Sequence, residues 1–158
     1  MKFGIIGAGM IANFHAEAIK AMAGGELHSF YGRRQDAVAE LVAAHGGKGY
    51  TDLDEFLADP DLDIVTIATP SGAHLEPALA AAKAGKHIIC EKPLEVTPER
   101  IDLMISACED AGVTLSGIFN RRFHPAMDAF KKAVDDGRFG TLTMCDAYVK
   151  WYRDQAYY

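Results

Sequence analysis

The sequence contains little cysteine, no long uninterrupted apolar run and no excess of basic residues, and each absence excludes a class of protein. The three cysteines, Cys90, Cys108 and Cys145, are far apart and odd in number, and no Cys or Cys/His spacing indicates zinc. No segment reaches the roughly 18 apolar residues of a membrane span. The net charge is −6 with acids and bases interspersed, which argues against a nucleic-acid surface.

These absences set simple expectations for the environment of the protein. The chain begins directly with a strand pattern, without a charged leader and apolar core, so no signal peptide is expected. Scattered cysteines are typical of a reducing compartment, which predicts a cytoplasmic location. We expect no metal site, no nucleic-acid partner and no membrane partner. With 158 residues, the chain is long enough for one ordinary domain with its own core.

What the sequence does contain is a glycine-rich turn at its start. The apolar run Phe3–Ile6 predicts a buried strand, and the six residues that follow it, GAGMIA, have the G-x-G-x-x-G/A form of dinucleotide-binding turns. Gly7 permits the tight turn, Gly9 lets backbone amides approach a diphosphate, and Ala12 lets the next helix pack closely. The free N–H groups of that helix would face the phosphates. The alternative is a glycine-rich turn without a ligand.

The second predicted strand, Glu26–Tyr31, ends without the acidic residue that usually accepts hydrogen bonds from the adenosine ribose. Gly32 stands there instead and is followed by Arg33 and Arg34. A guanidinium pairs with phosphate through forked, charge-assisted bonds, whereas a carboxylate would repel a ribose 2′-phosphate. The sequence therefore favours NADP over NAD, with Arg33 as the main candidate and Arg34 as the second. The alternative is two solvated arginines beside an NAD site.

Strand and helix patterns alternate along most of the chain. Further strands are predicted over residues 63–70, 87–90 and 113–119, and helices over residues 11–22, 36–45, 76–84, 98–111 and 125–134, with a short helix after Thr51. This alternation predicts an α/β fold with a doubly wound parallel sheet of the Rossmann type. His15, on the first helix, is predicted to be a packed or partly exposed residue rather than a ligand.

The end of the chain has a different pattern. Residues 141–151 alternate in part, which predicts a strand of an antiparallel sheet with one covered face. We therefore expect a nucleotide-binding domain over residues 1–120. Residues 121–158 would form a crossover helix and the first strand of an incomplete, antiparallel α+β C-terminal domain.

Lys92 follows the short predicted strand His87–Cys90, at the edge where open α/β sheets bind ligands. It is flanked by Glu91 and by Pro93, which fixes the turn. An ammonium at this place can donate a hydrogen bond to a hydroxyl beside a nicotinamide ring and can relay a proton. The alternative is a surface lysine paired with its neighbouring acid, and the tripeptide alone supports both equally.

Four motifs, taken together and in this order, resemble the glucose–fructose oxidoreductase / inositol dehydrogenase / rhizopine catabolism family. They are GAGMIA at 7–12, ATPSGAH at 68–74, AGKHIICEKP at 84–93 and FNRRFHP at 119–125. Members of this family are NAD(P)-dependent oxidoreductases, most of which act on sugars, cyclitols or nucleotide sugars. The resemblance implies a dehydrogenase with a small, sugar-like substrate. A non-catalytic dinucleotide-binding module or fragment is the alternative, and an activity like that of biliverdin reductase or dihydrodiol dehydrogenase is a third.

The resemblance also implies a set of cofactor-binding residues. They are Gly7, Gly9, Met10, Ile11, Gly32, Arg33, Arg34, Thr69, Pro70, His74, Glu91, Lys92, Asn120 and Arg122. Lys92 would also be the catalytic lysine, facing the substrate carbon. Ser71 stands where the family often has Asn.

The resemblance also implies what this chain lacks, because family members are roughly twice as long in domain terms. Their C-terminal domain supplies most of the substrate pocket, a catalytic histidine and usually the oligomer interface. We therefore expect this chain alone to be catalytically incomplete and the full-length protein to be a homo-oligomer.

Overall fold

The computed structural model describes residues 1–157. The chain divides into a compact unit of residues Met1–Phe119 and a second unit that begins at Asn120. The sequence places this boundary one residue later. That the second unit begins a substrate domain stays a prediction.

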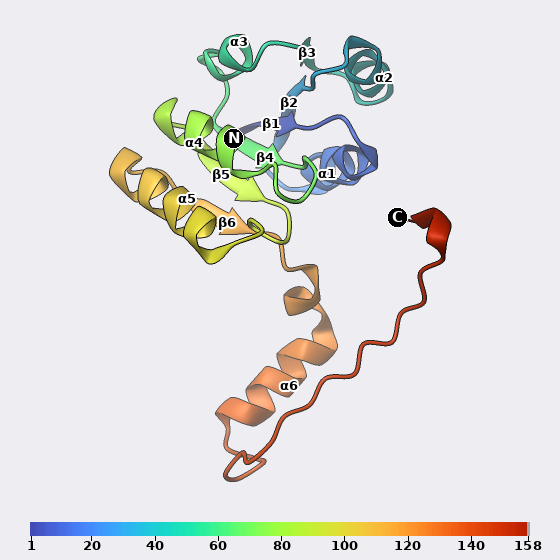
Figure 1. Ribbon diagram of the computed structural model, residues 1–158, viewed down its shortest axis with the longest axis vertical. Coiled ribbons are helices and arrows are strands. Elements are labelled where there is room, and N and C mark those ends of the chain that lie inside the picture. The colour runs from blue at the N-terminus through green and yellow to red at the C-terminus, as the bar shows by residue number, and fades with distance from the viewer. Residues whose placement is uncertain (158) are drawn as a thin grey trace. The chain divides into compact units, whose positions relative to one another are not determined.

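The first unit is built on one parallel sheet, as predicted, and this sheet has six strands (Figure 1). Its strands are β1 Lys2–Ile6, β2 Glu26–Tyr31, β3 Lys48–Tyr50, β4 Ile64–Ile67, β5 His87–Cys90 and β6 Leu115–Gly117. They lie in the order β3-β2-β1-β4-β5-β6, which is the Rossmann order. Strand β3 is missing from the sequence prediction because its residues, KGY, form no apolar run.

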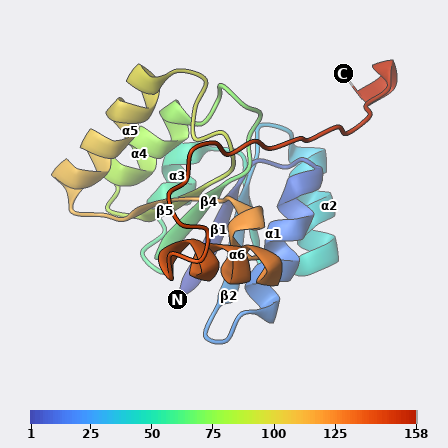
Figure 2. The same cartoon turned by 90° about the horizontal axis from the view of Figure 1, so that it is seen from below.

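Helices cover both faces of this sheet (Figure 2). They are α1 Met10–Ala21, α2 Gln35–His45, α3 Leu53–Leu57, α4 Leu75–Lys83 and α5 Pro98–Ala111. Helices α1 and α2 lie on one face, and α3, α4 and α5 lie on the other. The doubly wound prediction is therefore confirmed.

Two apolar cores result from the two-residue period of the strands. On β1, Phe3 and Ile5 pack into the core beneath α1 and α2, whereas Ile6 packs into the opposite core. Each core contains a fully buried phenylalanine, Phe30 in the first and Phe56 in the second. Burial of such a side chain stabilises the fold by about 2–3 kcal/mol.

Capping residues set the ends of helix α5, whose predicted bounds are confirmed. The side chain of Thr97 accepts a hydrogen bond from the amide of Arg100, and Pro98 occupies the first helical position. Gly112 ends the helix in the left-handed conformation, with φ of 67°. These local signals are readable in the sequence, which explains why this helix is predicted so closely.

The second unit contains the short 3-10 helix η1 (Asn120–Phe123), helix α6 (Pro125–Asp135) and the 3-10 helix η2 (Gln155–Tyr157). Helix α6 is one residue longer than predicted. The predicted strand over residues 141–151 is wrong, since this segment has no regular secondary structure. A strand needs a hydrogen-bonded neighbour, and none pairs with it among the residues described. Within residues 1–157, no helix has the length and apolar composition needed to cross a bilayer.

Candidate functional site

Four neighbouring strands end in a row at the carboxyl edge of the sheet. The residues that follow them are Gly7, Gly32, Ala68 and Glu91. Hydrogen bonds continue past the strand ends: the Gly7 amide donates to the Tyr31 carbonyl over 2.8 Å, and the Glu91 amide donates to the Ile67 carbonyl over 3.0 Å. The strand order changes direction between β1 and β4, and open α/β sheets bind ligands at such a switch point.

The turn after β1 needs a glycine at its first position and leaves space at its second. Gly7 has φ of +115°, and a Cβ there would lie 2.7 Å from the carbonyl oxygen of Ala68. At Gly9 a Cβ would meet no atom within 4 Å. Gly9 is the N-cap of α1 and provides no side-chain cap. The amides of Met10 and Ile11 have no hydrogen-bond partner among the described residues, so they are available to an anion.

A cleft of about 700 Å³ opens over this turn. Three loops line it, those that follow β1, β2 and β4. The predicted cofactor residues on its walls are Gly7, Gly9, Met10, Ile11, Gly32, Arg33, Arg34, Thr69 and Pro70. The uncapped helix and the open space at Gly9 fit the diphosphate of a dinucleotide. The individual roles of these residues stay predictions.

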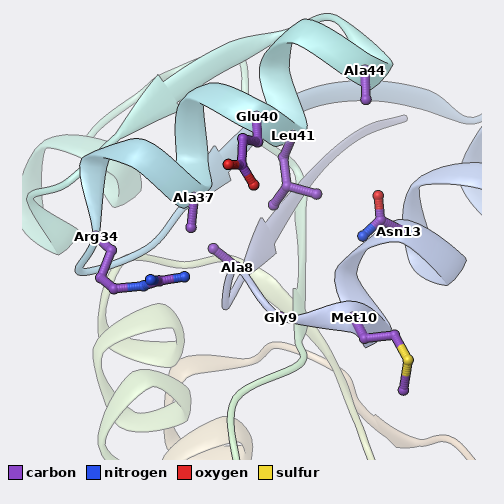
Figure 3. A pocket seen from close by; sticks show the side chains of 9 residues that line it. All are labelled: Ala8, Gly9, Met10, Asn13, Arg34, Ala37, Glu40, Leu41 and Ala44. Carbon is purple, nitrogen blue, oxygen red and sulfur yellow. The ribbon is translucent and has the colours of Figure 1, made fainter.

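A second hollow of about 460 Å³ lies between α1 and α2 (Figure 3). It shares Ala8, Gly9, Met10 and Arg34 with the first cleft. In Figure 3 the Arg34 side chain extends toward the glycine turn, while Glu40 and Asn13 lie on the helical walls. The Arg34 guanidinium also lies 3.6 Å from the exposed carboxylate of Asp36.

His74 does not present its ring to the cleft, contrary to the expectation of a direct cofactor contact. The residue is completely buried and lines neither hollow. Its Nε2 lies 2.9 Å from the carbonyl oxygen of Thr69, and its Nδ1 lies 2.9 Å from that of Pro93. Both ring nitrogens are therefore engaged with backbone, and His74 ties the loop after β4 to the loop after β5.

Glu95 is a buried acid that the sequence analysis missed. Its Oε2 accepts hydrogen bonds from the backbone amides of His74 and Leu75, at the start of α4, and from the guanidinium of Arg100. Burial raises the pKa of Glu95, but hydrogen bonds from the amides of Val96 and Leu75 and from Arg100 outweigh it, so the pKa lies below its ordinary value. Its partners at the start of α4 are 20 and 21 residues away in sequence, which is why no local pattern reveals this contact.

Lys92 is exposed, and its ammonium has no hydrogen bond or ion pair to any residue in the described part of the chain. The Lys92–Pro93 peptide bond is cis. The neighbouring carboxylate of Glu91 accepts instead from His15 Nε2 over 3.2 Å and from the Lys92 backbone amide over 3.0 Å. The alternative of an ion pair between Lys92 and Glu91 is therefore not observed.

Asn120 and Arg122 belong to η1 of the second unit, where both are exposed. Their assignment to the cofactor site stays a prediction.

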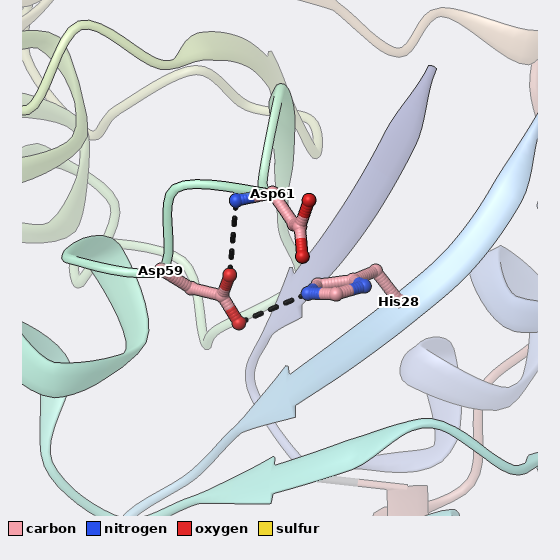
Figure 4. A group of neighbouring side chains, drawn as sticks. All are labelled: His28, Asp59 and Asp61. Carbon is pink, nitrogen blue, oxygen red and sulfur yellow. Dashed lines mark hydrogen bonds and ion pairs between the residues drawn. The ribbon is translucent and has the colours of Figure 1, made fainter.

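The opposite, amino edge of the sheet contains a polar cluster of His28, Asp59 and Asp61 (Figure 4). Asp59 Oδ2 accepts hydrogen bonds from His28, Lys48 and Tyr50 at 3.0, 2.8 and 2.9 Å. These bonds from Lys48 and His28 hold the pKa of Asp59 well below its usual range. The Lys48 ammonium already lies beside this carboxylate, so the cluster does not fit a cation site. Its hydrogen bonds instead connect β2, β3 and the segment before β4.

Comparisons with known proteins agree with this geometry. A family model described as "Oxidoreductase family, NAD-binding Rossmann fold" matches residues 1–119. The myo-inositol 2-dehydrogenase of Thermotoga maritima is 37% identical over 141 residues, covering 89% of this chain and 42% of the relative. The 1,5-anhydro-D-fructose reductase of Ensifer adhaerens is 36% identical, covering 88% of this chain and 42% of its own length.

A solved structure gives the same result. The WlbA dehydrogenase from Bordetella pertussis, in complex with NADH and UDP-GlcNAcA, is 34% identical and has a TM-score of 0.84, with 88% of this chain and 43% of that chain covered. The chain thus spans less than half the length of these relatives. Since the family model matches the whole of its first unit, the chain belongs to the oxidoreductase family with the NAD-binding Rossmann fold, as the resemblance in its motifs implies.

Proposed function

We propose that this chain is the nucleotide-binding half of an NAD(P)-dependent dehydrogenase that acts on a carbinol of a sugar, cyclitol or nucleotide sugar. One observation carries the proposal: two kinds of hydrogen-bond donor without a partner among the described residues lie at the same edge of the sheet. The amides of Met10 and Ile11 suit a diphosphate, and the ammonium of Lys92 suits a reacting oxygen. Strand β4 lies between β1 and β5, whose ends carry these groups.

In this proposal the three loops of the larger cleft bind successive parts of the cofactor. The turn from Gly7 to Ile11 holds the diphosphate, and Gly32 with the two arginines surrounds the adenosine ribose. Thr69 and Pro70 lie on the side of the second ribose. His74 holds that loop through the Thr69 carbonyl oxygen rather than binding the cofactor itself.

We infer that NADP is preferred. Arg33 lines the cleft, is exposed and forms no ion pair with any described residue. Arg34 lines both hollows but already has Asp36 beside it, which makes Arg33 the better phosphate ligand. The hollow between α1 and α2 adds room beyond the ribose, and Glu40 on its far wall would keep a phosphate on the arginine side.

The chemistry assigned to Lys92 is proton transfer at the substrate oxygen. A nicotinamide bound in the cleft supplies the hydride donor or acceptor. In the direction of reduction, Lys92 Nζ donates a hydrogen bond to the substrate carbonyl oxygen and gives it the proton that completes the hydroxyl. In the direction of oxidation, the neutral amine takes that proton from the hydroxyl.

The names of the relatives support a sugar-like substrate, since they specify an inositol and an anhydrofructose, and the WlbA structure contains UDP-GlcNAcA. We further propose that the full-length protein is a homo-oligomer and is cytoplasmic. The free thiols of Cys90, Cys108 and Cys145 fit a reducing compartment.

Separate calorimetric titrations of NADPH and NADH into the chain test the function. Both should bind, with NADPH about tenfold tighter. Equal or tighter binding of NADH would contradict the preference for NADP. Absence of heat with either coenzyme, on protein shown to be folded by circular dichroism, would contradict the function itself.

A non-catalytic dinucleotide-binding module is the second candidate. This candidate is favoured because every residue that lines the two hollows lies within the first unit. Coenzyme reduction by the full-length protein, with a panel of cyclitols and aldoses, separates the two. Turnover that falls at least about 100-fold in Lys92→Met supports the dehydrogenase, whereas binding without turnover supports the module.

A further inference from the structure

We propose that His15 is a positioning residue that orients the Glu91 carboxylate, beside Lys92 at the carboxyl edge of the sheet, toward the nicotinamide ribose of a bound cofactor. The inference rests on the proposed function, because the orientation of Glu91 matters only if a dinucleotide binds. It adds a role for helix α1, whose N-terminus faces the diphosphate and whose second turn would control the other end of the cofactor.

His15 joins three segments that are far apart in sequence. It lies on α1 and is only 8% exposed. Its Nδ1 lies 2.9 Å from Thr66 Oγ1 on β4, and its Nε2 lies 3.2 Å from Glu91 Oε1 after β5. Thr66 is itself buried, with 3% of its surface exposed. The ring therefore links α1 to β4 and to the residue that follows β5.

The partners of the ring determine where its protons lie. An ionised carboxylate only accepts hydrogen bonds, so Nε2 carries the proton that is donated to Glu91. In the neutral ring Nδ1 then accepts, and the Thr66 hydroxyl donates to it. The Glu91 carboxylate thus sets the tautomer of His15, and the Thr66 hydroxyl, which can donate or accept, holds the other ring nitrogen in place.

Two donors then fix the Glu91 carboxylate. Nε2 of His15 binds Oε1, and the backbone amide of Lys92 binds Oε2. The Glu91 side chain is 17% exposed, so part of it faces solvent and can accept from a ribose hydroxyl. Without His15 only the Lys92 amide would hold the carboxylate, and the side chain could rotate away from the cofactor.

Helix α1 also places His15 in register with the phosphate-binding turn. His15 follows Ile11 by four residues, so the two lie on one side of the helix. Helix α1 would therefore help to position both a diphosphate bound at the Ile11 amide and a ribose bound at Glu91.

The test compares two ligands that differ by the second ribose. ADP contains the adenosine and the diphosphate, whereas ADP-ribose adds the ribose that Glu91 would bind. His15→Asn retains a group near the position of Nδ1, toward Thr66, but is too short to reach Glu91. His15→Gln places an amide donor near the position of Nε2, which makes it the matched conservative variant.

By calorimetry, His15→Asn should bind ADP-ribose about tenfold more weakly than wild type while its affinity for ADP is unchanged. His15→Gln should recover affinity to within about threefold of wild type. Glu91→Ala should show the same selective loss, and the double variant His15→Asn/Glu91→Ala should lose no more than either single variant. Such non-additivity is expected only if His15 acts through Glu91.

Equal losses for ADP and ADP-ribose, or additive losses in the double variant, would show a purely structural His15 and overturn the inference. Unchanged ADP-ribose affinity in His15→Asn would overturn it as well. If His15→Asn unfolds, the ratio of ADP-ribose affinity to ADP affinity is still measured in Glu91→Ala and in His15→Gln. The inference then requires a selective loss of ADP-ribose affinity in Glu91→Ala and near wild-type affinity in His15→Gln. Failure of wild-type protein to bind either ligand would instead contradict the proposed function.

Discussion

The two edges of the central sheet differ in whether their polar groups have hydrogen-bond partners within the chain. At the carboxyl edge, the amides of Met10 and Ile11 and the ammonium of Lys92 have no partner within residues 1–157. At the amino edge, Asp59 accepts four hydrogen bonds through its two carboxylate oxygens, from His28, Lys48, Tyr50 and the Asp61 amide. The Lys86 ammonium beside it donates to two backbone carbonyls.

This difference shows which edge stabilises the fold and which is available to a ligand. Buried polar groups are normally hydrogen-bonded, so a saturated cluster needs no further partner. Unpartnered donors beside a cleft are satisfied by water or by a ligand. The amino edge therefore contributes stability, and the carboxyl edge contributes the binding site.

The largest effect is expected at the amino edge. Asp59→Ala removes the acceptor shared by a buried histidine and a lysine, and it should lower the free energy of unfolding by about 3 kcal/mol. Urea denaturation followed by circular dichroism measures this change. Asp61→Ala is the control and should have a far smaller effect, because the Asp61 side chain is 58% exposed. A coenzyme affinity that falls in folded Asp59→Ala would contradict the division between the edges.

At the carboxyl edge, Gly9→Asp should separate binding from stability. An aspartate at this N-cap accepts from the amides of α1 and supports the helix, but its charge takes the place of the diphosphate. Coenzyme affinity should fall about 100-fold, which is about 2.7 kcal/mol, while the melting temperature is unchanged or higher.

Gly9→Asn is the matched control for this variant, because it caps without a charge and should weaken binding less. Equal coenzyme affinity in Gly9→Asp and wild type would place the diphosphate elsewhere.

The choice of coenzyme should depend on one arginine. Arg33→Ala should weaken NADPH binding about tenfold, or about 1.4 kcal/mol, and leave NADH binding unchanged. Arg34→Ala should have a smaller effect, since Arg34 lies beside Asp36. Parallel titrations of both coenzymes measure this, and equal losses for NADPH and NADH would remove the basis for NADP preference.

The smallest effect concerns acid stability. Hydrogen bonds from Lys48 and His28 lower the pKa of Asp59 in the folded protein. The ionised carboxylate therefore contributes fully to stability above the pKa of the unfolded chain, about 3.9, and this contribution is lost as pH falls further. The stability gap between wild type and Asp59→Asn should therefore narrow below about pH 4. Urea titrations at several pH values measure the gap, and a constant gap would contradict this origin.

The carboxyl edge was far easier to predict from the sequence than the amino edge. Glycines in the turn after β1 and the Glu-Lys-Pro block after β5 are local signals that mark strand ends. Asp59 at the amino edge binds His28, which is distant in sequence, so only the folded chain reveals its role. The same holds at the carboxyl edge for Glu95, which binds the amide of Leu75. The predictions for strand β3 and for segment 141–151 were wrong for a related reason. Whether an extended segment joins a sheet depends on the presence of a neighbouring strand.

Amide chemical shifts of the 15N-labelled protein during an NADPH titration test the central claim most directly, because they report both edges at once. The amides of Met10, Ile11 and Gly32 should shift and saturate together, while those of His28 and Asp59 stay in place. Shifts confined to the amino edge, or none at either edge, would contradict the assignment of the dinucleotide to the carboxyl edge of the sheet.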